Sequence, residues 1–435
     1  MPRAQPIKAF QELQDHVQLF CDLPAEAIVK QDVLRLGLRF SDAAMTIAAG
    51  FKPKDYFIFS FDLIEIKDMQ ADEHLRVPEE IKVSGGPFSL KPTVISVRIN
   101  PHSPYLVDVQ DGQLCLLNDD VNLGEVTFHP IPPFYHESLS TGKKMGELAP
   151  VLEWGYLIYL TVYRMCQYFN REEQCQFCDI NRNFIQQRKA GKPYTGIKSA
   201  DEILEALGHI DRMDQEAKAY TLTGGSIITG LQGVAEVDFY CQYIEAIEAT
   251  FPGRWIAKAV VQAFEVGDCQ RLKQAGLQIY HPNYEVWGDE LFRAICPGKA
   301  RVIGFQSWIQ RVAESASVFG PENVIPNFVG GVEMNRVCGF SDPERAVAHT
   351  TEGLDWFMSR GIMPRFTTWC PEPLAALGPH PAPPLSYYGL LLRSWRERFM
   401  HYGLRIPPGY GSPGAGNAVF SVSAFMDVLP CEEAH

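Results

Sequence analysis

Residues 166–178 read CQYFNREEQCQFC and bring three cysteines, Cys166, Cys175 and Cys178, together with the spacing C-x8-C-x2-C. The stretch follows residues 156–165, an apolar run that is typical of a buried strand. Three thiolates this close together suit a soft metal ion or an iron–sulfur cluster. We therefore expect a strand to deliver a thiol-rich loop to the ligand-binding end of a sheet.

The spacing alone leaves three interpretations of these cysteines open. Three thiolates can hold a four-iron cluster and leave one iron free for another ligand. A structural zinc site needs a closed set of four ligands, and no histidine lies between residues 137 and 208. The third interpretation is a buried C-x2-C pair beside an unrelated cysteine, because free cysteines often pack as small apolar residues.

Strand-like and helix-like stretches alternate from residue 150 onward. This alternation favours an α/β fold with a parallel sheet and outer helices. Six units fit an open doubly wound sheet or a partial (β/α)6 TIM-like barrel, and both bind ligands at the carboxyl ends of the strands. The predicted strands are 156–165, 219–225, 254–264, 278–287, 324–331 and 363–370. The predicted helices are 199–216, 234–251, 268–276, 301–318, 342–361 and 387–403.

The chain divides into three predicted parts. Residues 1–145 are expected to form an accessory domain, helical at its start and then mostly β, because short alternating runs are separated by turn residues. These runs are 56–64, 93–99, 105–109 and 113–117. Residues 150–405 are expected to form the barrel, and residues 406–435 a loop-like tail with a short apolar segment at 418–428.

Composition excludes several classes of protein. The 435 residues carry a net charge of −13, so the chain has no general attraction to nucleic acid or anionic membranes. The N-terminus lacks the apolar stretch of a signal peptide, and no apolar run is long enough to span a membrane. We therefore expect a cytoplasmic protein whose thiols stay reduced. Its 11 cysteines are too few for a disulfide scaffold.

The end of the cysteine stretch, Cys175-Gln176-Phe177-Cys178, resembles the signature of the radical S-adenosylmethionine (SAM) superfamily. The usual signature has three residues in its first gap, whereas this chain has eight. The longer gap resembles a less-studied group in the biotin-synthase-like branch. The resemblance implies that Cys166, Cys175 and Cys178 bind a [4Fe–4S] cluster and that Phe177 lies beside the cofactor.

Further motifs match this superfamily in the same order along the chain. Thr223-Gly224-Gly225-Ser226 resembles a glycine-rich motif whose backbone binds the methionine amino group of SAM. The other matches are the polar ends of the third and fourth strands and a small-residue segment beside the adenine. The resemblance thus implies SAM binding by Gly224, Gly225, Ser226, Gln262, Glu265, Asn283, Glu285, Val329 and Gly330.

The chemistry of the superfamily gives the expected function. Its members cleave SAM reductively at the cluster, and the resulting 5′-deoxyadenosyl radical abstracts hydrogen from a substrate. We expect a small-molecule substrate that is rearranged or joined at carbon, and an electron donor such as flavodoxin or ferredoxin. One alternative is a sulfur- or methyl-transferring radical SAM enzyme. An alternative of another class is a non-catalytic zinc or iron–sulfur module that regulates a partner.

Three residues are predicted to act on the substrate, because they lie at strand ends. Tyr284 follows the fourth strand, and its alternative role is that of a core aromatic residue. Arg365 can clamp a carboxylate or phosphate, or it can form an outer ion pair, since strand alternation does not fix its direction. Cys370 can supply hydrogen or join a second cluster, or it can simply pack.

Overall fold

The computed structural model describes residues 9–54, 61–65, 68, 77–189, 191, 196–378 and 380–431 of the chain. Its centre is a row of six parallel strands that follow one another in sequence order. They are β8 (Leu157–Tyr163), β9 (Ala219–Gly224), β10 (Ile256–Val261), β11 (Ile279–Pro282), β12 (Asn327–Gly330) and β13 (Arg365–Thr368). All six predicted strands are confirmed.

The pairing between β11 and β12 is less extensive than the pairing between the other neighbouring strands. Two isolated parallel bridges, Tyr280 to Val324 and Glu285 to Phe328, join the two halves there. A short strand, β7 (Val151–Leu152), pairs antiparallel with β8 at the other edge. In the described part of the chain β13 does not pair with β7 or β8, so the structure shows no closed barrel.

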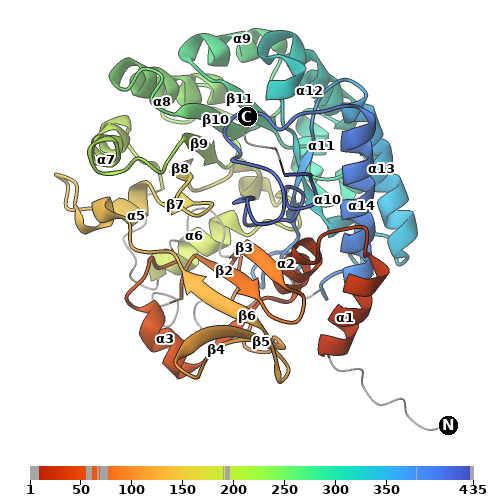
Figure 1. Cartoon of the computed structure of the whole chain (residues 1–435). Coiled ribbons are helices and arrows are strands. Elements are labelled where there is room, and N and C mark those ends of the chain that lie inside the picture. The colour runs from red at the N-terminus through yellow and green to blue at the C-terminus, as the bar shows by residue number, and fades with distance from the viewer. Residues whose placement is uncertain are drawn as a thin grey trace.

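Helices lie around the outside of the strands (Figure 1). The six predicted helices are confirmed as α7 (Ala200–Met213), α8 (Glu236–Thr250), α9 (Val266–Ala275), α12 (Phe305–Phe319), α13 (Pro343–Met358) and α14 (Leu385–His401). Three further helices were not predicted. They are α6 (Ile180–Lys189), α10 (Asp289–Ile295) and α11 (Pro297–Val302). The prediction for 301–318 joined the end of α11 to α12, whereas Gly304, at φ 85°, separates them.

Alternation along the strands separates an apolar outer face from a polar inner face. On β9, Tyr220 and Leu222 are buried, and the Tyr220 hydroxyl lies 3.4 Å from the Glu248 carboxylate of α8. Thr221 and Thr223, the alternate residues, line an internal cavity. Successive side chains of a strand point to opposite faces, so the threonines face inward and the apolar residues meet the helices. Polar side chains are therefore directed to where a ligand can bind.

The N-terminal part forms a second sheet, drawn at the bottom of Figure 1. Its strand order is β1-β4-β5-β6-β2-β3. The strands are β1 (Arg39–Phe40), β2 (Glu80–Gly85), β3 (Leu90–Ser96), β4 (Tyr105–Gln110), β5 (Gln113–Asn118) and β6 (Val121–Phe128). The short helices of this part are α1 (Ala9–Leu19), α2 (Ala25–Leu36), α3 (Asp42–Ala48) and α5 (Met145–Leu148). Of the predicted strand 56–64, residues 56–60 lie outside the described residues, and 61–64 form no strand.

The C-terminal tail joins the two sheets. The backbone N–H of Ser96 in β3 donates to Ser421, and that of Thr368 in β13 donates to Val422, each at 3.1 Å. The tail carboxylate of Asp427 also forms a buried ion pair of 2.8 Å with Lys30 of α2. The tail has little regular secondary structure, yet most of its side chains from residue 418 to 429 are buried. The division at residues 145, 150 and 405 remains a prediction.

Among the described residues, no helix is both long enough and apolar enough to cross a membrane.

Candidate functional site

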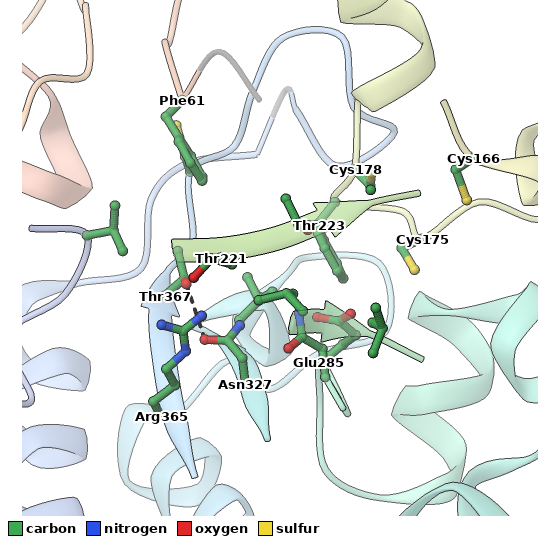
Figure 2. A pocket seen from close by; sticks show the side chains of 18 of the residues that line it. Phe61, Cys166, Cys175, Cys178, Thr221, Thr223, Glu285, Asn327, Arg365 and Thr367 are labelled. Carbon is green, nitrogen blue, oxygen red and sulfur yellow. Dashed lines mark hydrogen bonds between the residues drawn. The ribbon is translucent and has the colours of Figure 1, made fainter. Parts of the chain in front are cut away.

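A cavity of about 210 Å³ lies at the carboxyl ends of the parallel strands. Polar side chains meet there from two sources: the loops that follow the strands, and the strand residues that point inward. Figure 2 shows the three cysteines toward one end of this cavity and Arg365 toward the other. Twelve of the predicted site residues line it: Cys166, Cys175, Phe177, Cys178, Gly224, Ser226, Gln262, Asn283, Glu285, Val329, Arg365 and Cys370.

The cysteine loop is pinned to three neighbouring segments. The side-chain amide of Asn181, in α6, accepts a hydrogen bond of 2.6 Å from the N–H of Cys166 and donates one of 3.2 Å to its carbonyl. The N–H of Gln167 donates to Ser226 at 3.0 Å, and that of Gln176 donates to Ile295 at 2.8 Å. The loop therefore has a fixed path, although it has no strand or long helix of its own.

Gly225 is needed for the close approach of this loop. A Cβ atom at position 225 would lie 2.5 Å from the Cβ of Cys166 and would also overlap the carbonyl of Met165. Real Cβ atoms do not come so close to other atoms, so any side chain would push the loop away from β9. Gly225 does not line the cavity, and its contact in the structure is with the residues that position Cys166.

The three thiols are half-buried and influence one another. Burial raises the pKa of Cys166 to about 11. Burial also raises the pKa of Cys178 well above its usual range, and the neighbouring Cys175 and Cys166 raise it further. Binding of metal removes these protons, because thiolate is the ligand.

The donor set fits an iron–sulfur cluster. Three thiols face one cavity, and no other side chain is needed to complete three attachment points. In the described residues no three His, Cys, Asp or Glu side chains converge on a single ion. Thiolates that bind three different irons of a cluster stand farther apart than the ligands of one ion. A cluster therefore needs a wider spacing of the three cysteine sulfur atoms than a single ion does.

A buried carboxyl group completes the wall beside β10. Glu236, the first residue of α8, accepts a hydrogen bond from the side-chain amide of Gln262, and the Tyr168 hydroxyl donates to the Gln262 carbonyl oxygen at 2.8 Å. Burial raises the pKa of Glu236 to about 8, despite the hydrogen bond from Gln262. Glu236 can therefore hold a proton at neutral pH inside the cavity.

A buried ion pair supports the fourth strand end. The Lys299 ammonium lies 2.6 Å from the Glu285 carboxylate and 3.3 Å from the Asn283 carbonyl oxygen. The same ammonium lies 4.6 Å from the centre of the Trp308 ring. The side-chain oxygen of Asn283 is buried without a hydrogen-bond partner in the structure. An unpaired amide oxygen in a cavity wall is an acceptor that a ligand can use.

Four predicted residues lie outside the lining. Glu265 begins α9, is largely exposed and pairs with Arg311 at 2.8 Å. Gly330 fits closely against the side chains of Phe366 and Leu391, so its small size serves packing. Gly225 supports the loop as described above.

Tyr284 is the fourth of these residues, and it points away from the cavity. It packs in an aromatic cluster, with ring centres 5.6 Å from Phe328 and 4.9 Å from Phe357. The alternation that turns Asn283 inward turns Tyr284 outward. The structure therefore gives Tyr284 the surroundings of a core aromatic residue, which is the alternative to its predicted catalytic role.

Arg365 and Cys370 both line the cavity, so strand alternation turns Arg365 inward. Burial raises the pKa of Cys370 well above its usual range, which keeps this thiol protonated. The roles predicted for these two residues stay predictions.

Sequence reasoning missed several lining residues. Phe61 comes from the N-terminal part and Phe420 from the tail, and only long-range folding brings them to the strand ends. Glu153 precedes β8, and Glu236 is the first residue of α8. Carboxylates are common at the start of a helix because they stabilise it locally, so Glu236 did not stand out. Lys299 lies in the first turn of α11, and its ion pair with Glu285 could not be predicted from the sequence.

Comparisons with known proteins gave limited similarity. No family model matches the chain. A curated relative, bacteriochlorophyllide c C-7(1)-hydroxylase from Chlorobaculum limnaeum, is 26% identical over 117 residues. The match covers 27% of this chain and spans about a quarter, 26%, of that relative.

Two crystal structures are similar over a larger part of the chain. Methylornithine synthase gives a TM-score of 0.38 at 12% identity, and the match covers 62% of this chain and 76% of that one. HydG, a maturase of the [FeFe]-hydrogenase, gives a TM-score of 0.40 at 13% identity, with 62% and 60% covered. At these TM-scores the similarity carries no argument about function.

Proposed function

We propose that this chain is a radical SAM enzyme of the biotin-synthase-like kind that acts on a small molecule. The observation that carries the proposal is the convergence of three cysteines, spaced C-x8-C-x2-C, on one cavity at the carboxyl ends of six parallel strands. The same cavity is lined by the strand-end residues that the superfamily motifs assign to SAM, among them Gly224, Gln262 and Asn283.

Different residues of the chain would bind the cluster and SAM. Cys166, Cys175 and Cys178 would bind three irons of a [4Fe–4S] cluster and leave the fourth for SAM. Gly224 and Ser226 present backbone groups beside the cysteine loop, and Asn283 offers a buried amide oxygen without a partner. When both cofactors are bound, they supply an electron and a 5′-deoxyadenosyl radical for hydrogen abstraction from carbon.

The walls of the cavity keep water from this chemistry. Phe61, Trp369 and Phe420 line it with apolar rings that come from three distant segments of the chain. Exclusion of water prevents side reactions of reactive intermediates. The substrate is a small molecule, and a flavodoxin or ferredoxin is the proposed source of the electron.

The curated relative supports the proposal in one respect. Its name describes hydroxylation at a carbon atom, so the matched stretch belongs to a protein that acts at a carbon position. A transfer of sulfur or of a methyl group starts from the same site and stays the alternative outcome.

Anaerobic reconstitution with iron and sulfide tests the proposed cluster. The wild-type chain should gain about four irons and four sulfides, show broad visible absorption, and give an electron paramagnetic resonance signal on reduction. A colourless chain that instead binds one zinc ion tightly would overturn the proposal and favour a zinc-binding module. Cys175→Ala should lose the cluster. Cys21→Ala, which changes an exposed cysteine far from the three cluster cysteines in sequence, should retain it.

A further inference from the structure

The cavity has an inner end that the cysteines do not reach. Figure 2 shows Arg365, Asn327 and Thr367 there, away from the thiols. Arg365 and Asn327 are register partners on β13 and β12, and Thr367 donates to the Asn327 side chain at 3.3 Å. Asn327 and Arg365 are the first residues of β12 and β13, and Thr367 is the third residue of β13, so all three lie deeper in the molecule than the loop residues that follow those strands.

The structure records no ion pair between Arg365 and a carboxylate of the described residues, and the buried Nε–H of Arg365 has no hydrogen-bond partner there. The buried carboxyl group of Glu153 acts on Arg365 electrostatically without forming an ion pair with it. The guanidinium instead lies 5.2 Å from the centre of the Phe420 ring and 5.7 Å from the centre of the Tyr410 ring. A guanidinium carries donors in a planar fork that matches a carboxylate, so an arginine left unpaired in a cavity wall is a site for an anion.

The charges around Arg365 favour a single negative charge on that anion. Lys258 is buried nearby and donates 2.7 Å to the Gly409 carbonyl oxygen, and it forms no ion pair with a carboxylate of the residues that the structure describes. Burial lowers its pKa to about 8, so it is still mostly protonated at pH 7. Glu153 is the buried carboxylate that influences both cations. Burial raises the pKa of Glu153, so the two cations and this carboxyl group leave a surplus of at least about one positive charge.

We propose that the inner end of the cavity binds the carboxylate of a small, singly charged organic acid, with Arg365 as the anchoring residue. This assignment names the substrate class of the enzyme proposed above and rests on that proposed function. The body of the acid is small, because the cavity of about 210 Å³ holds it between the rings of Phe61, Trp369 and Phe420 and polar side chains of the strands. With its carboxylate at Arg365, the carbon chain extends toward the cysteine end, where hydrogen abstraction takes place.

Calorimetric titration of the full-length chain tests this assignment without turnover. Butyrate is the probe, butyramide is its neutral match, and inorganic phosphate is the dianionic competitor. Butyrate should bind at least about tenfold more tightly than butyramide, and phosphate should not displace it. Arg365→Gln should weaken butyrate about tenfold or more, and Arg365→Lys should weaken it less, because lysine keeps the charge and loses the fork. Arg311→Gln, on the surface, should bind butyrate as the wild type does.

Two further measurements keep the result interpretable. Near-ultraviolet circular dichroism shows whether each variant is folded. In the wild type, an arginine-specific reagent followed by peptide mass spectrometry should modify Arg365 less when butyrate is present, and butyramide should not protect it.

The assignment is overturned if butyramide binds as well as butyrate, if phosphate displaces it, or if Arg365 is not protected. All titrations are run on the cluster-free and the reconstituted chain. Selective butyrate binding by a chain in which no cluster can be reconstituted would contradict the proposed function alone, whereas a reconstituted cluster without carboxylate selectivity would contradict the inference alone.

Discussion

At the scale of single residues, the position of the thiols depends on a residue that has no side chain. Gly225 lets the backbone of Cys166 pass directly over the end of β9. Thr221 and Thr223, the inward-facing residues of the same strand, line the cavity. The cysteine loop, the strand end and the cavity are therefore fixed by one close contact.

Gly225→Ala should move the cysteine loop. The added methyl group would overlap Met165 and Cys166, and overpacking of this kind costs about 1–3 kcal/mol of stability. The iron bound after reconstitution should fall at the same time. Gly267→Ala is the control, because position 267 lies in α9 and has no atom within 4 Å of an added Cβ. Equal iron content in the two variants would show that the contact does not position Cys166.

Glu236 gives the stability of the protein a pH dependence. Its pKa of about 8 lies above the ordinary value of 4.5, so the folded protein holds a proton that the unfolded chain releases. Stability from this group is complete below about pH 4.5 and is lost as the pH rises through about 8. The difference in unfolding free energy between wild type and Glu236→Gln should therefore fall with pH, by up to about 1.4 kcal/mol per unit. Urea titrations at several pH values measure it, and a flat difference would contradict the protonated state.

At the scale of elements, the parallel strands were the part of the fold that sequence could predict. Each is a short apolar run followed by a helix, and two of these helices have clear start signals: the side chain of Ser199 caps α7 and that of Asp342 caps α13. Local rules of this kind need no knowledge of the rest of the chain. The helices α6, α10 and α11 were missed, because they have only 10, 7 and 6 residues and show too little of a helical period, and their stability comes from packing.

The direction of individual side chains was harder to predict. Strand alternation narrows Arg365 and Tyr284 to two faces each, and only the observed register decides that the first faces inward and the second outward. The same holds for Lys299, which reaches Glu285 from a helix 14 residues later in the chain. Ion pairs of this type depend on tertiary structure, which sequence spacing does not give.

The pair of Lys299 and Glu285 joins α11 to the end of β11, and its loss should be costly. Lys299→Met leaves the buried Glu285 carboxylate unpaired and should lower the unfolding free energy by about 3–5 kcal/mol. The double variant Lys299→Met, Glu285→Leu should recover most of this loss, since neither charge is then buried. Arg293→Met, which removes an exposed pair with Asp289, should change stability by less than about 1 kcal/mol. Additive losses in the double variant would contradict the coupling.

At the scale of the whole molecule, three distant segments close one cavity. Phe61 comes from the N-terminal part, the cysteines from the first half of the strand row, and Phe420 from the tail. The tail hydrogen bonds to β3 and β13 hold these segments together. Composition and periodicity cannot predict such closure, because the three segments are separated by more than 100 residues each.

Phe61→Ala should open the cavity to water. The backbone N–H of Phe61 donates 2.7 Å to the Glu372 carboxylate, so the segment should keep its place while the ring is lost. Reduced enzyme should then form 5′-deoxyadenosine without substrate at a rate at least about twofold above wild type. Phe88→Ala, at a partly exposed ring of the N-terminal sheet that does not line the cavity, is the matched control. The same rate in both variants would remove Phe61 from the shielding role.

The central claim is that the three cysteines serve the reductive cleavage of SAM. The most direct measurement is the amount of 5′-deoxyadenosine that anaerobically reconstituted, dithionite-reduced protein forms from SAM. The account predicts 5′-deoxyadenosine and methionine in equal amounts from the wild type and from Cys21→Ala, and none from Cys175→Ala. Wild-type protein that holds the cluster but forms no 5′-deoxyadenosine would contradict the account, as would cleavage by Cys175→Ala at the wild-type rate.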